Sequence, residues 1–262
     1  MLINTQRTKR SLSGPRAGLL TFLVSLLLVS VLYFLVVRGS GQPRLDGLSG
    51  DSTLTIARVA GPIPRDPGAA AWTGIEPVKV RLYPQTVRPP FGTEERDVWI
   101  RGMYDDREVA FLLEFADASE DRDATPGPDA CAIMLVPDAA RTARQMMGHG
   151  GRANVWHWLA DRDAARYRAG DDSVRAVHSL LAAGPGTQSL MARQTVDGRG
   201  TYEGGKWGVL FGRPLASQQE GELELAPGHD LGISIAVWDG GRGERLSRKS
   251  IAITRALHLE PE

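Results

Sequence analysis

An uncharged apolar run near the N-terminus constrains this chain more than any other feature. Residues 17–37 read AGLLTFLVSLLLVSVLYFLVV, which is 21 residues without a charged side chain. As an α-helix rising about 1.5 Å per residue, the run would be about 32 Å long and would match the hydrocarbon core of a bilayer. A helix also pairs its own backbone polar groups, which lipid cannot do. We therefore predict a transmembrane helix over residues 17–37.

The charges before this run predict its orientation. Four basic residues and no acidic residue precede it, namely Arg7, Lys9, Arg10 and Arg16. Short basic flanks stay in the cytoplasm, so residues 1–16 should be cytoplasmic and the main domain periplasmic or otherwise extracytoplasmic. A cleaved signal peptide is the alternative, but its apolar core is about 7–15 residues long and ends at a small-residue cleavage site. We expect an uncleaved, single-pass anchor in the cytoplasmic membrane.

The remainder divides into a linker at residues 38–55, rich in Gly and Ser, and a domain at 56–262. The whole chain has 31 basic and 31 acidic residues, but residues 1–38 hold five basic residues and no acidic one. The rest therefore has 26 basic and 31 acidic residues, a net charge of −5, which argues against a nucleic-acid partner. The single cysteine, Cys131, permits no internal disulfide and no covalent C-x-x-C-H haem attachment.

Short apolar or alternating segments separated by Gly, Pro and Asp predict a mainly β domain. Many short strands without a long amphipathic helix are typical of an antiparallel β-sandwich. Residues Ala139–Met147 and Asp161–Arg168 could each form a short helix. The predicted strands are Val78–Tyr83, Asp97–Gly102, Glu108–Phe115, Cys131–Val136, Asn154–Trp158, Trp207–Arg213, Leu231–Trp238 and Ser250–Leu259.

No catalytic motif stands out: G-x-S-x-G, H-E-x-x-H, the Walker loop and G-x-G-x-x-G are all missing from the sequence. The acidic run Ser119–Asp129 lacks the spacing of an EF-hand, and we interpret it as a solvated loop. The histidines are scattered, with none at metal-site spacing. His149 is the least ordinary, because Met146 and Met147 lie just before it and thioether sulfur suits iron or copper(I). From the residues alone, the chain is an anchored β-sandwich with a candidate metal or haem site.

A series of segments, each weak alone, resembles one family in order and spacing. That family is the haem b-binding gamma subunits of ethylbenzene dehydrogenase, dimethyl sulfide dehydrogenase and related molybdoenzyme complexes, including a membrane-anchored branch like nitrite oxidoreductase and nitrate reductase. The segments are Trp72–Ile75, Leu82–Gln85, Val98–Arg101, Ala110–Phe115 with Asp117, Asp129–Ala132, Met134–Pro137, Met146–Gly148, Asn154–Trp158, Trp207–Leu210 with Arg213–Leu215, Ala236–Gly240, Glu244–Arg245 and Lys249–Ser250.

The resemblance implies an immunoglobulin-like β-sandwich that binds one non-covalent haem b through a methionine and a lysine. These positions are Met147 and Lys249 here, with Met146 and His149 as the weaker candidates. A lysine binds iron only as the neutral amine, so its pKa must be lowered by burial and by the metal. With both axial positions filled, the haem would transfer electrons and would not bind oxygen or substrate.

The resemblance also implies the partners: a molybdenum-cofactor catalytic subunit, an iron–sulfur subunit, and a membrane-bound or soluble electron carrier. The chain alone would then turn over no substrate. Two other hypotheses remain at this point. One is an anchored ligand- or carbohydrate-binding β-sandwich, in which exposed Trp72, Trp156 and Trp158 would stack on sugars. The other is a scaffold subunit that has lost its haem.

Overall fold

The computed structural model describes residues 53–123, 125–137, 153–184, 186–229 and 231–260, and residues 50–262 form one compact unit. The predicted transmembrane helix at 17–37 and the predicted helix at Ala139–Met147 lie outside the described residues. Within the described ranges, no helix is both long enough and apolar enough to cross a bilayer.

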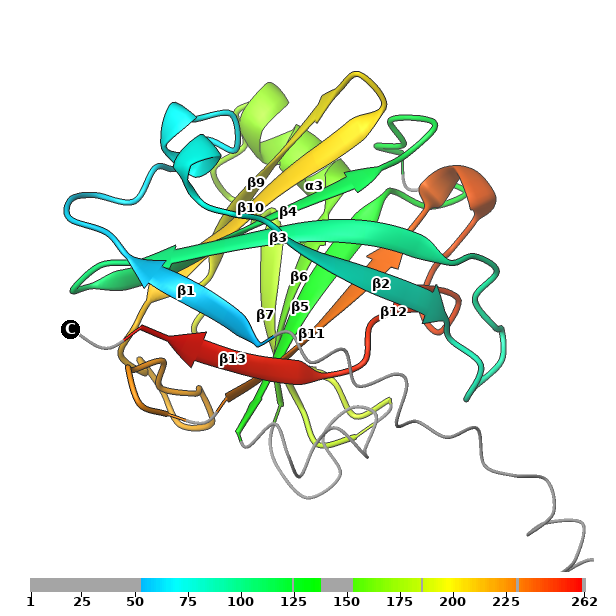
Figure 1. Ribbon diagram of the computed structural model, residues 1–262. Coiled ribbons are helices and arrows are strands. Elements are labelled where there is room, and N and C mark those ends of the chain that lie inside the picture. The colour runs from blue at the N-terminus through cyan, green and yellow to red at the C-terminus, as the bar shows by residue number, and fades with distance from the viewer. Residues whose placement is uncertain (1–52, 124, 138–152, 185, 230, 261–262) are drawn as a thin grey trace, which may run out of the picture. The chain divides into compact units, whose positions relative to one another are not determined.

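Two layers of strands make up the domain, so the predicted mainly β fold is confirmed (Figure 1). One layer has the order β8–β7–β6–β5–β11–β12, and the other has the order β2–β3–β4–β10–β9. The strands of the first layer are β5 (Ala130–Pro137), β6 (Ala153–Leu159), β7 (Val177–Ala182), β8 (Ser189–Leu190), β11 (Leu231–Trp238) and β12 (Ser250–Ile251). Those of the second are β2 (Val78–Pro84), β3 (Arg96–Tyr104), β4 (Glu108–Ala116), β9 (Asp197–Glu203) and β10 (Lys206–Pro214).

The layers are joined at two places, and one of them departs from the antiparallel prediction. β12 pairs with both β11 and β2. β1 (Leu54–Arg58) pairs in parallel with β3 and with β13 (Arg255–Leu259), and β13 is antiparallel to β11. All other strand pairs between described residues are antiparallel. Parallel pairing needs a long crossover connection, which residues 59–95 provide between β1 and β3 and nearly the whole domain provides between β1 and β13.

Most predicted strands lie within a residue or two of the observed bounds. The predicted strand Ser250–Leu259 is wrong in one respect, because it is divided into β12 and β13. Sequence reasoning missed β1, β7, β8 and β9. β1 begins two residues before the predicted start of the domain. The predicted helix at Asp161–Arg168 is confirmed as α3 (Ala160–Asp163) followed by η3 (Ala164–Arg168), and short 3₁₀ turns form η2 (Ala70–Gly74) and η4 (Gly240–Arg242).

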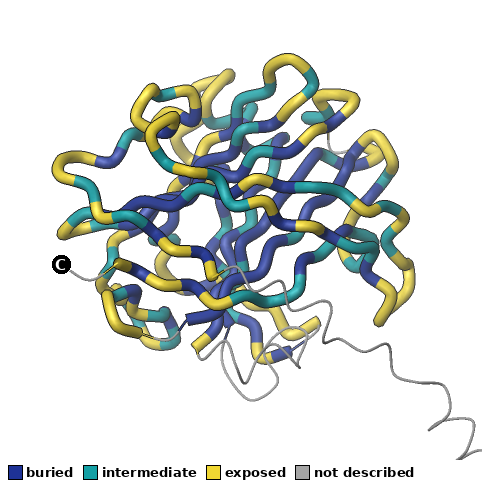
Figure 2. Tube along the Cα trace, in the orientation of Figure 1, coloured by how far each residue is buried: buried dark blue, intermediate teal, exposed yellow. Residues whose placement is uncertain are grey.

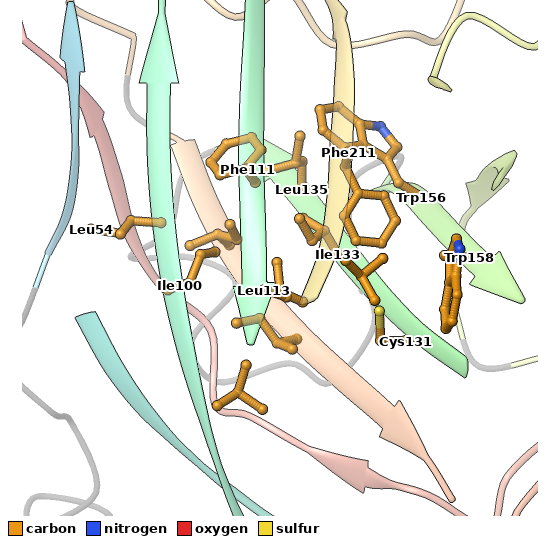
Figure 3. Packing of buried hydrophobic residues seen from close by; sticks show 14 of the residues in the cluster. Leu54, Ile100, Phe111, Leu113, Cys131, Ile133, Leu135, Trp156, Trp158 and Phe211 are labelled. Carbon is orange, nitrogen blue, oxygen red and sulfur yellow. The ribbon is translucent and has the colours of Figure 1, made fainter. Parts of the chain in front are cut away.

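The main core fills the space between the two layers (Figures 2 and 3). Period-two alternation sends one set of side chains from each strand inward, which is why Cys131, Ile133 and Leu135 of β5 face Phe111 and Leu113 of β4. The tryptophans enlarge this core: the rings of Trp158 and Trp207 lie 4.9 Å apart, edge to face. The buried cysteine is a core side chain with no disulfide partner.

Two buried carboxylates hold the tryptophans in place. The Asp163 Oδ1 atom accepts hydrogen bonds from Trp158 Nε1 at 3.1 Å and from Gly200 N at 2.8 Å. The Asp129 Oδ2 atom accepts one from Trp207 Nε1 at 2.9 Å. These bonds satisfy indole N–H groups that would otherwise be buried without a partner. They also tie α3 and the β4–β5 loop to the core.

Gly200 tests how tightly this part of the core is packed. A Cβ at residue 200 would lie 2.2 Å from Trp158 Cζ2, whereas one at Gly208 on the adjacent strand would meet nothing nearer than 3.5 Å. We predict that Gly200→Ala lowers the free energy of unfolding by about 1–3 kcal/mol through overpacking. Gly208→Ala should change it by about 0.5 kcal/mol or less. Chemical denaturation of the two variants measures the difference, and equal effects would contradict the packing described.

Candidate functional site

The first layer has a second apolar face, on the side away from the main core. On β5, Cys131, Ile133 and Leu135 enter the core, and the alternate residues Ala130, Ala132, Met134 and Val136 lie on the other side. β6, β7 and β11 continue this outer face. It forms a separate cluster that we call the outer apolar face: Ala130, Ala132, Met134, Val136, Ala153, Val155, Leu180, Ala182, Ala236 and Trp238.

Small side chains dominate the outer apolar face. Half of its members are alanine, and these come from all four strands. Cross-strand pairing places Ala132 between His157 of β6 and Ala236 of β11. Rows of alanine side chains make this sheet surface shallow, and seven of its ten members are buried in this structure. Its larger members include Met134, Leu180 and Trp238.

Lys249 stands beside this face, at the residue before β12. Its amine nitrogen lies 4.7 Å from the ring centroid of Trp238. Its carbonyl accepts a hydrogen bond from Gln85 N at 2.9 Å, and a Cβ at Gly92 would come within 2.1 Å of that oxygen. The backbone of Lys249 is therefore fixed by a close approach that only glycine allows at residue 92. Burial lowers the pKa of the Lys249 amine to about 8, so a neutral amine is accessible close to physiological pH.

His157 shares the neighbourhood of Lys249 and Trp238. Its ring centroid lies 4.9 Å from that of Trp238, and its cross-strand partner on β7 is His178. Burial, and then the positive charge of Lys249, lower the pKa of His157 to about 3, so the imidazole is neutral. Its Nε2 atom is buried and has no hydrogen-bond partner among the described residues. Such an atom costs free energy unless something else satisfies it.

The arrangement offers neutral nitrogen donors at the border of a shallow apolar surface. The pKa shift of the Lys249 amine comes from burial, and no carboxylate among the described residues forms an ion pair with it. A neutral amine and a neutral imidazole are both ligands for transition metals. The outer apolar face is therefore suited to a flat apolar group that carries a metal.

Of the candidate haem ligands that the sequence singled out, the structure describes Lys249 only. Met146, Met147 and His149 lie at 138–152, outside the described residues. That segment joins Pro137, at the end of β5, to Ala153, at the start of β6. Both strands contribute to the outer apolar face. The axial pair of Met147 and Lys249 stays a prediction.

Sequence reasoning missed His157 and His178. They are 21 residues apart along the chain, so spacing could not bring them together, but the β6–β7 register places them opposite each other. The alternation in Asn154–Trp158 carried a signal: His157 must point away from the face that holds Trp156 and Trp158. Both of these tryptophans are fully buried, and so is Trp72. The prediction that these three rings are exposed for sugar stacking is therefore wrong.

Comparisons with known proteins bear on this site. The family model described as ethylbenzene dehydrogenase matches residues 181–250, a range that includes Lys249. A protein of Haloferax mediterranei named as a respiratory nitrate reductase heme subunit is 28% identical over 196 residues, which are 72% of this chain and 66% of that protein. The dimethylsulfide dehydrogenase subunit gamma of Rhodovulum sulfidophilum is 24% identical, over 72% of this chain and 73% of that one.

The chlorate reductase subunit gamma of Ideonella dechloratans is 29% identical over 38% of this chain and 36% of that one. The chain is related to this gamma-subunit family, as its sequence predicted. Among solved structures, a family 9 carbohydrate-binding module of Caldicellulosiruptor kristjanssonii with cellotriose is 11% identical, with a TM-score of 0.47 over 80% of this chain and 95% of that one. At that level, the likeness does not bear on ligand or function.

The lowered pKa of Lys249 predicts a pH dependence in the ligand-free chain. Between pH 8 and the ordinary lysine pKa of 10.5, the unfolded state holds a proton on Lys249 that the folded state has released. The free energy of unfolding should therefore rise with pH over this window. Below pH 8, the protonated amine should lower it by the full cost of the buried charge. Lys249→Met should raise the melting temperature at pH 7 and flatten the rise between pH 8 and 10.5.

Lys206→Met, at an exposed lysine of β10, is the matched control for this effect. Its stability profile should run parallel to that of the unchanged protein across the same window. Thermal melts of the three proteins at several pH values measure the difference. A Lys249→Met profile parallel to the other two would show that Lys249 titrates as an ordinary surface lysine.

Proposed function

We propose that this chain is a membrane-anchored haem b electron-transfer subunit of a periplasm-facing molybdenum and iron–sulfur oxidoreductase complex. Met147 and Lys249 would be the axial ligands of one non-covalent haem. The observation that carries the proposal is the half-buried Lys249 at the border of the outer apolar face, where burial lowers the pKa of its amine. The family supports it, because relatives of this chain are named as a heme subunit and as gamma subunits.

The described residues fit such a cofactor. The small alanine side chains of β5, β6, β7 and β11 would leave room for an apolar macrocycle beside Lys249. Lys249 would present its amine to the iron, and burial already favours the neutral form that coordination requires. When bound, the haem supplies a reversible one-electron change between ferric and ferrous iron.

Neighbouring side chains would orient the lysine. The Trp238 indole donates a hydrogen bond to Leu246 O at 3.0 Å, which fastens the segment leading to Lys249 onto the outer apolar face. The same ring lies against the Lys249 amine. The unpartnered Nε2 of His157 is a polar atom that a haem propionate, or water held by one, would satisfy.

Electron transfer follows from the number of ligands. A haem held by a methionine sulfur on one side and a lysine nitrogen on the other has no open position for oxygen or substrate. The chain would then carry electrons without converting a substrate itself. A catalytic subunit with a molybdenum cofactor and an iron–sulfur subunit would be its partners, and a membrane-bound or soluble carrier would complete the path. The loops that bear Met147 and Lys249 are the natural contact surface, because electron tunnelling requires short gaps between cofactors.

The ligand assignment predicts distinct spectra for single substitutions. Met147→Ala and Lys249→Ala should each convert low-spin haem to high-spin haem or cause its loss, because each removes an axial donor. Lys249→Arg should fail to restore the low-spin spectrum, since a guanidinium stays protonated and has no lone pair to donate. Optical and electron paramagnetic resonance spectra of the purified chain measure the spin state.

His149→Ala and Met146→Leu are the matched controls, and both should keep the low-spin spectrum. His157→Ala tests the neighbour that the structure adds, and it should alter haem retention without removing a ligand. Should Lys249→Ala stay low-spin while His149→Ala or His157→Ala turns high-spin, the iron is held by a histidine, and the lysine assignment is wrong. A chain with no Soret band would favour the haem-free scaffold.

The membrane topology proposed for the anchor predicts on which side of the membrane a protease can digest the domain. With the basic flank in the cytoplasm, the domain that follows residue 55 should be outside, so protease added to intact spheroplasts should digest it. A cytoplasmic protein probed in parallel should stay intact until lysis. Protection of the domain in intact spheroplasts would contradict the proposed orientation.

A further inference from the structure

Four aspartates, three from the β4–β5 loop and one after β11, meet at one end of the domain. Asp117 follows β4, Asp121 and Asp129 belong to the β4–β5 loop, and Asp239 follows β11. One carboxylate oxygen of each of the four lies within 4.8 Å of the others. Asp117, Asp129 and Asp239 are buried, and Asp121 is half-buried. None of the four residues of this acidic cluster is a member of the outer apolar face, although Asp129 directly precedes Ala130 and Asp239 directly follows Trp238 of that face.

The charges of the acidic cluster are not balanced by the described residues around it. Arg96 and Arg242 approach Asp239, at 3.7 Å and 3.3 Å. Over the described part of the chain, no basic side chain forms an ion pair with Asp117, Asp121 or Asp129. Buried like charges repel strongly where water cannot screen them, so a bound cation would stabilise the cluster.

Asp117 gives an independent sign of a missing ligand. The residue is 7% exposed, and its Oδ2 atom is buried with no hydrogen-bond partner among the described residues. Its other oxygen accepts the backbone N–H of Ser119. A buried carboxylate oxygen without a donor is costly, and here it belongs to a group whose oxygens converge on one point.

The backbone around the acidic cluster is built for close packing. Asp129 accepts hydrogen bonds from the N–H groups of Asp121 and Gly240, both at 2.8 Å. A Cβ at Gly240 would lie 2.3 Å from Gly127 O, and one at Gly241 would lie 2.8 Å from Asp121 Oδ2. Side chains larger than glycine would therefore separate the β4–β5 loop from the segment after β11, and the four carboxylates could not converge.

We propose that Asp117, Asp121, Asp129 and Asp239 form a structural calcium site. Calcium takes six to eight oxygen ligands at about 2.4 Å, so two oxygens on opposite sides of the ion are about 4.8 Å apart. Four carboxylate oxygens within 4.8 Å of one another fit that sphere. Loop carbonyls and water would complete the coordination. The ion would join the β4–β5 loop to the segment after β11.

The ligand types separate calcium from other metals. Zinc prefers nitrogen and sulfur donors, and among the described residues the group contains neither histidine nor cysteine. Magnesium demands octahedral oxygens at about 2.0–2.1 Å, which brings opposite oxygens to about 4.2 Å or closer. The all-carboxylate donor set, and the larger and more flexible coordination sphere that calcium accepts, favour calcium.

The test uses the full-length protein in mild detergent after treatment with EGTA and removal of the chelator. Thermal melting is followed with CaCl₂, with MgCl₂, and with NaCl at matched ionic strength. At a calcium concentration about 100-fold above the dissociation constant, the melting temperature should rise by about 5–10 °C. Magnesium should give a much smaller rise. No calcium-specific rise would overturn the proposal.

Substitutions locate the site. Asp117→Asn removes one ligand charge and relieves the repulsion, so it should raise or preserve the melting temperature without calcium and weaken calcium binding about tenfold or more by calorimetry. Asp121→Asn, at the least buried member, repeats the test. The control is Asp97→Asn, which removes ion pairs with Lys79 and Arg81 elsewhere and should leave the calcium response unchanged. A normal calcium response in both cluster variants would overturn the site. Since no haem signal is measured, these outcomes are independent of the proposed function.

Discussion

The rest of the structure depends on a sheet layer that is apolar on both faces. β5, β6 and β11 are buried along nearly their whole length, where a strand of a one-sided sheet would alternate between buried and exposed. Their inward side chains pack against the second layer and form the main core. Their outward side chains form the outer apolar face. Burial on the core side fixes the strand register, and the register then decides which residues share the outer face.

The loops at one end of this layer are held by polar groups, whereas apolar packing holds the strands. Asp129 connects the β4–β5 loop, the core tryptophan of β10 and the backbone after β11. Glu244 accepts the N–H of Asp239 and pairs with Arg96. Gln85 donates to Ser247 O through its side chain and to Lys249 O through its backbone. The backbone of Lys249 and of nearby Ser247 is thus held by Gln85, which suits the proposed role of the Lys249 side chain as a metal ligand.

The buried tryptophans separate the hypotheses that the sequence left open. A sugar-binding platform needs exposed aromatic faces, and the three rings considered for that role are instead parts of cores. The outer apolar face is also unlike a sugar site, since alanine and aliphatic side chains dominate it. The relatives named as a heme subunit and gamma subunits agree with an apolar, cofactor-like ligand.

By itself, the sequence determined the mainly β fold, most strand positions and the relationship to the gamma subunits. These properties follow from local alternation and from ordered short motifs, which can be recognised in one dimension. Only the tertiary structure decided what depends on strand register and loop contact. It divided Ser250–Leu259 into two strands, because β13 pairs with β1 from the far end of the domain. It set His157 opposite His178 and turned both away from the core. It also changed the interpretation of the run Ser119–Asp129: no linear spacing could reveal a cation site whose other members, Asp117 and Asp239, come from the ends of two separate strands and meet only when the chain folds.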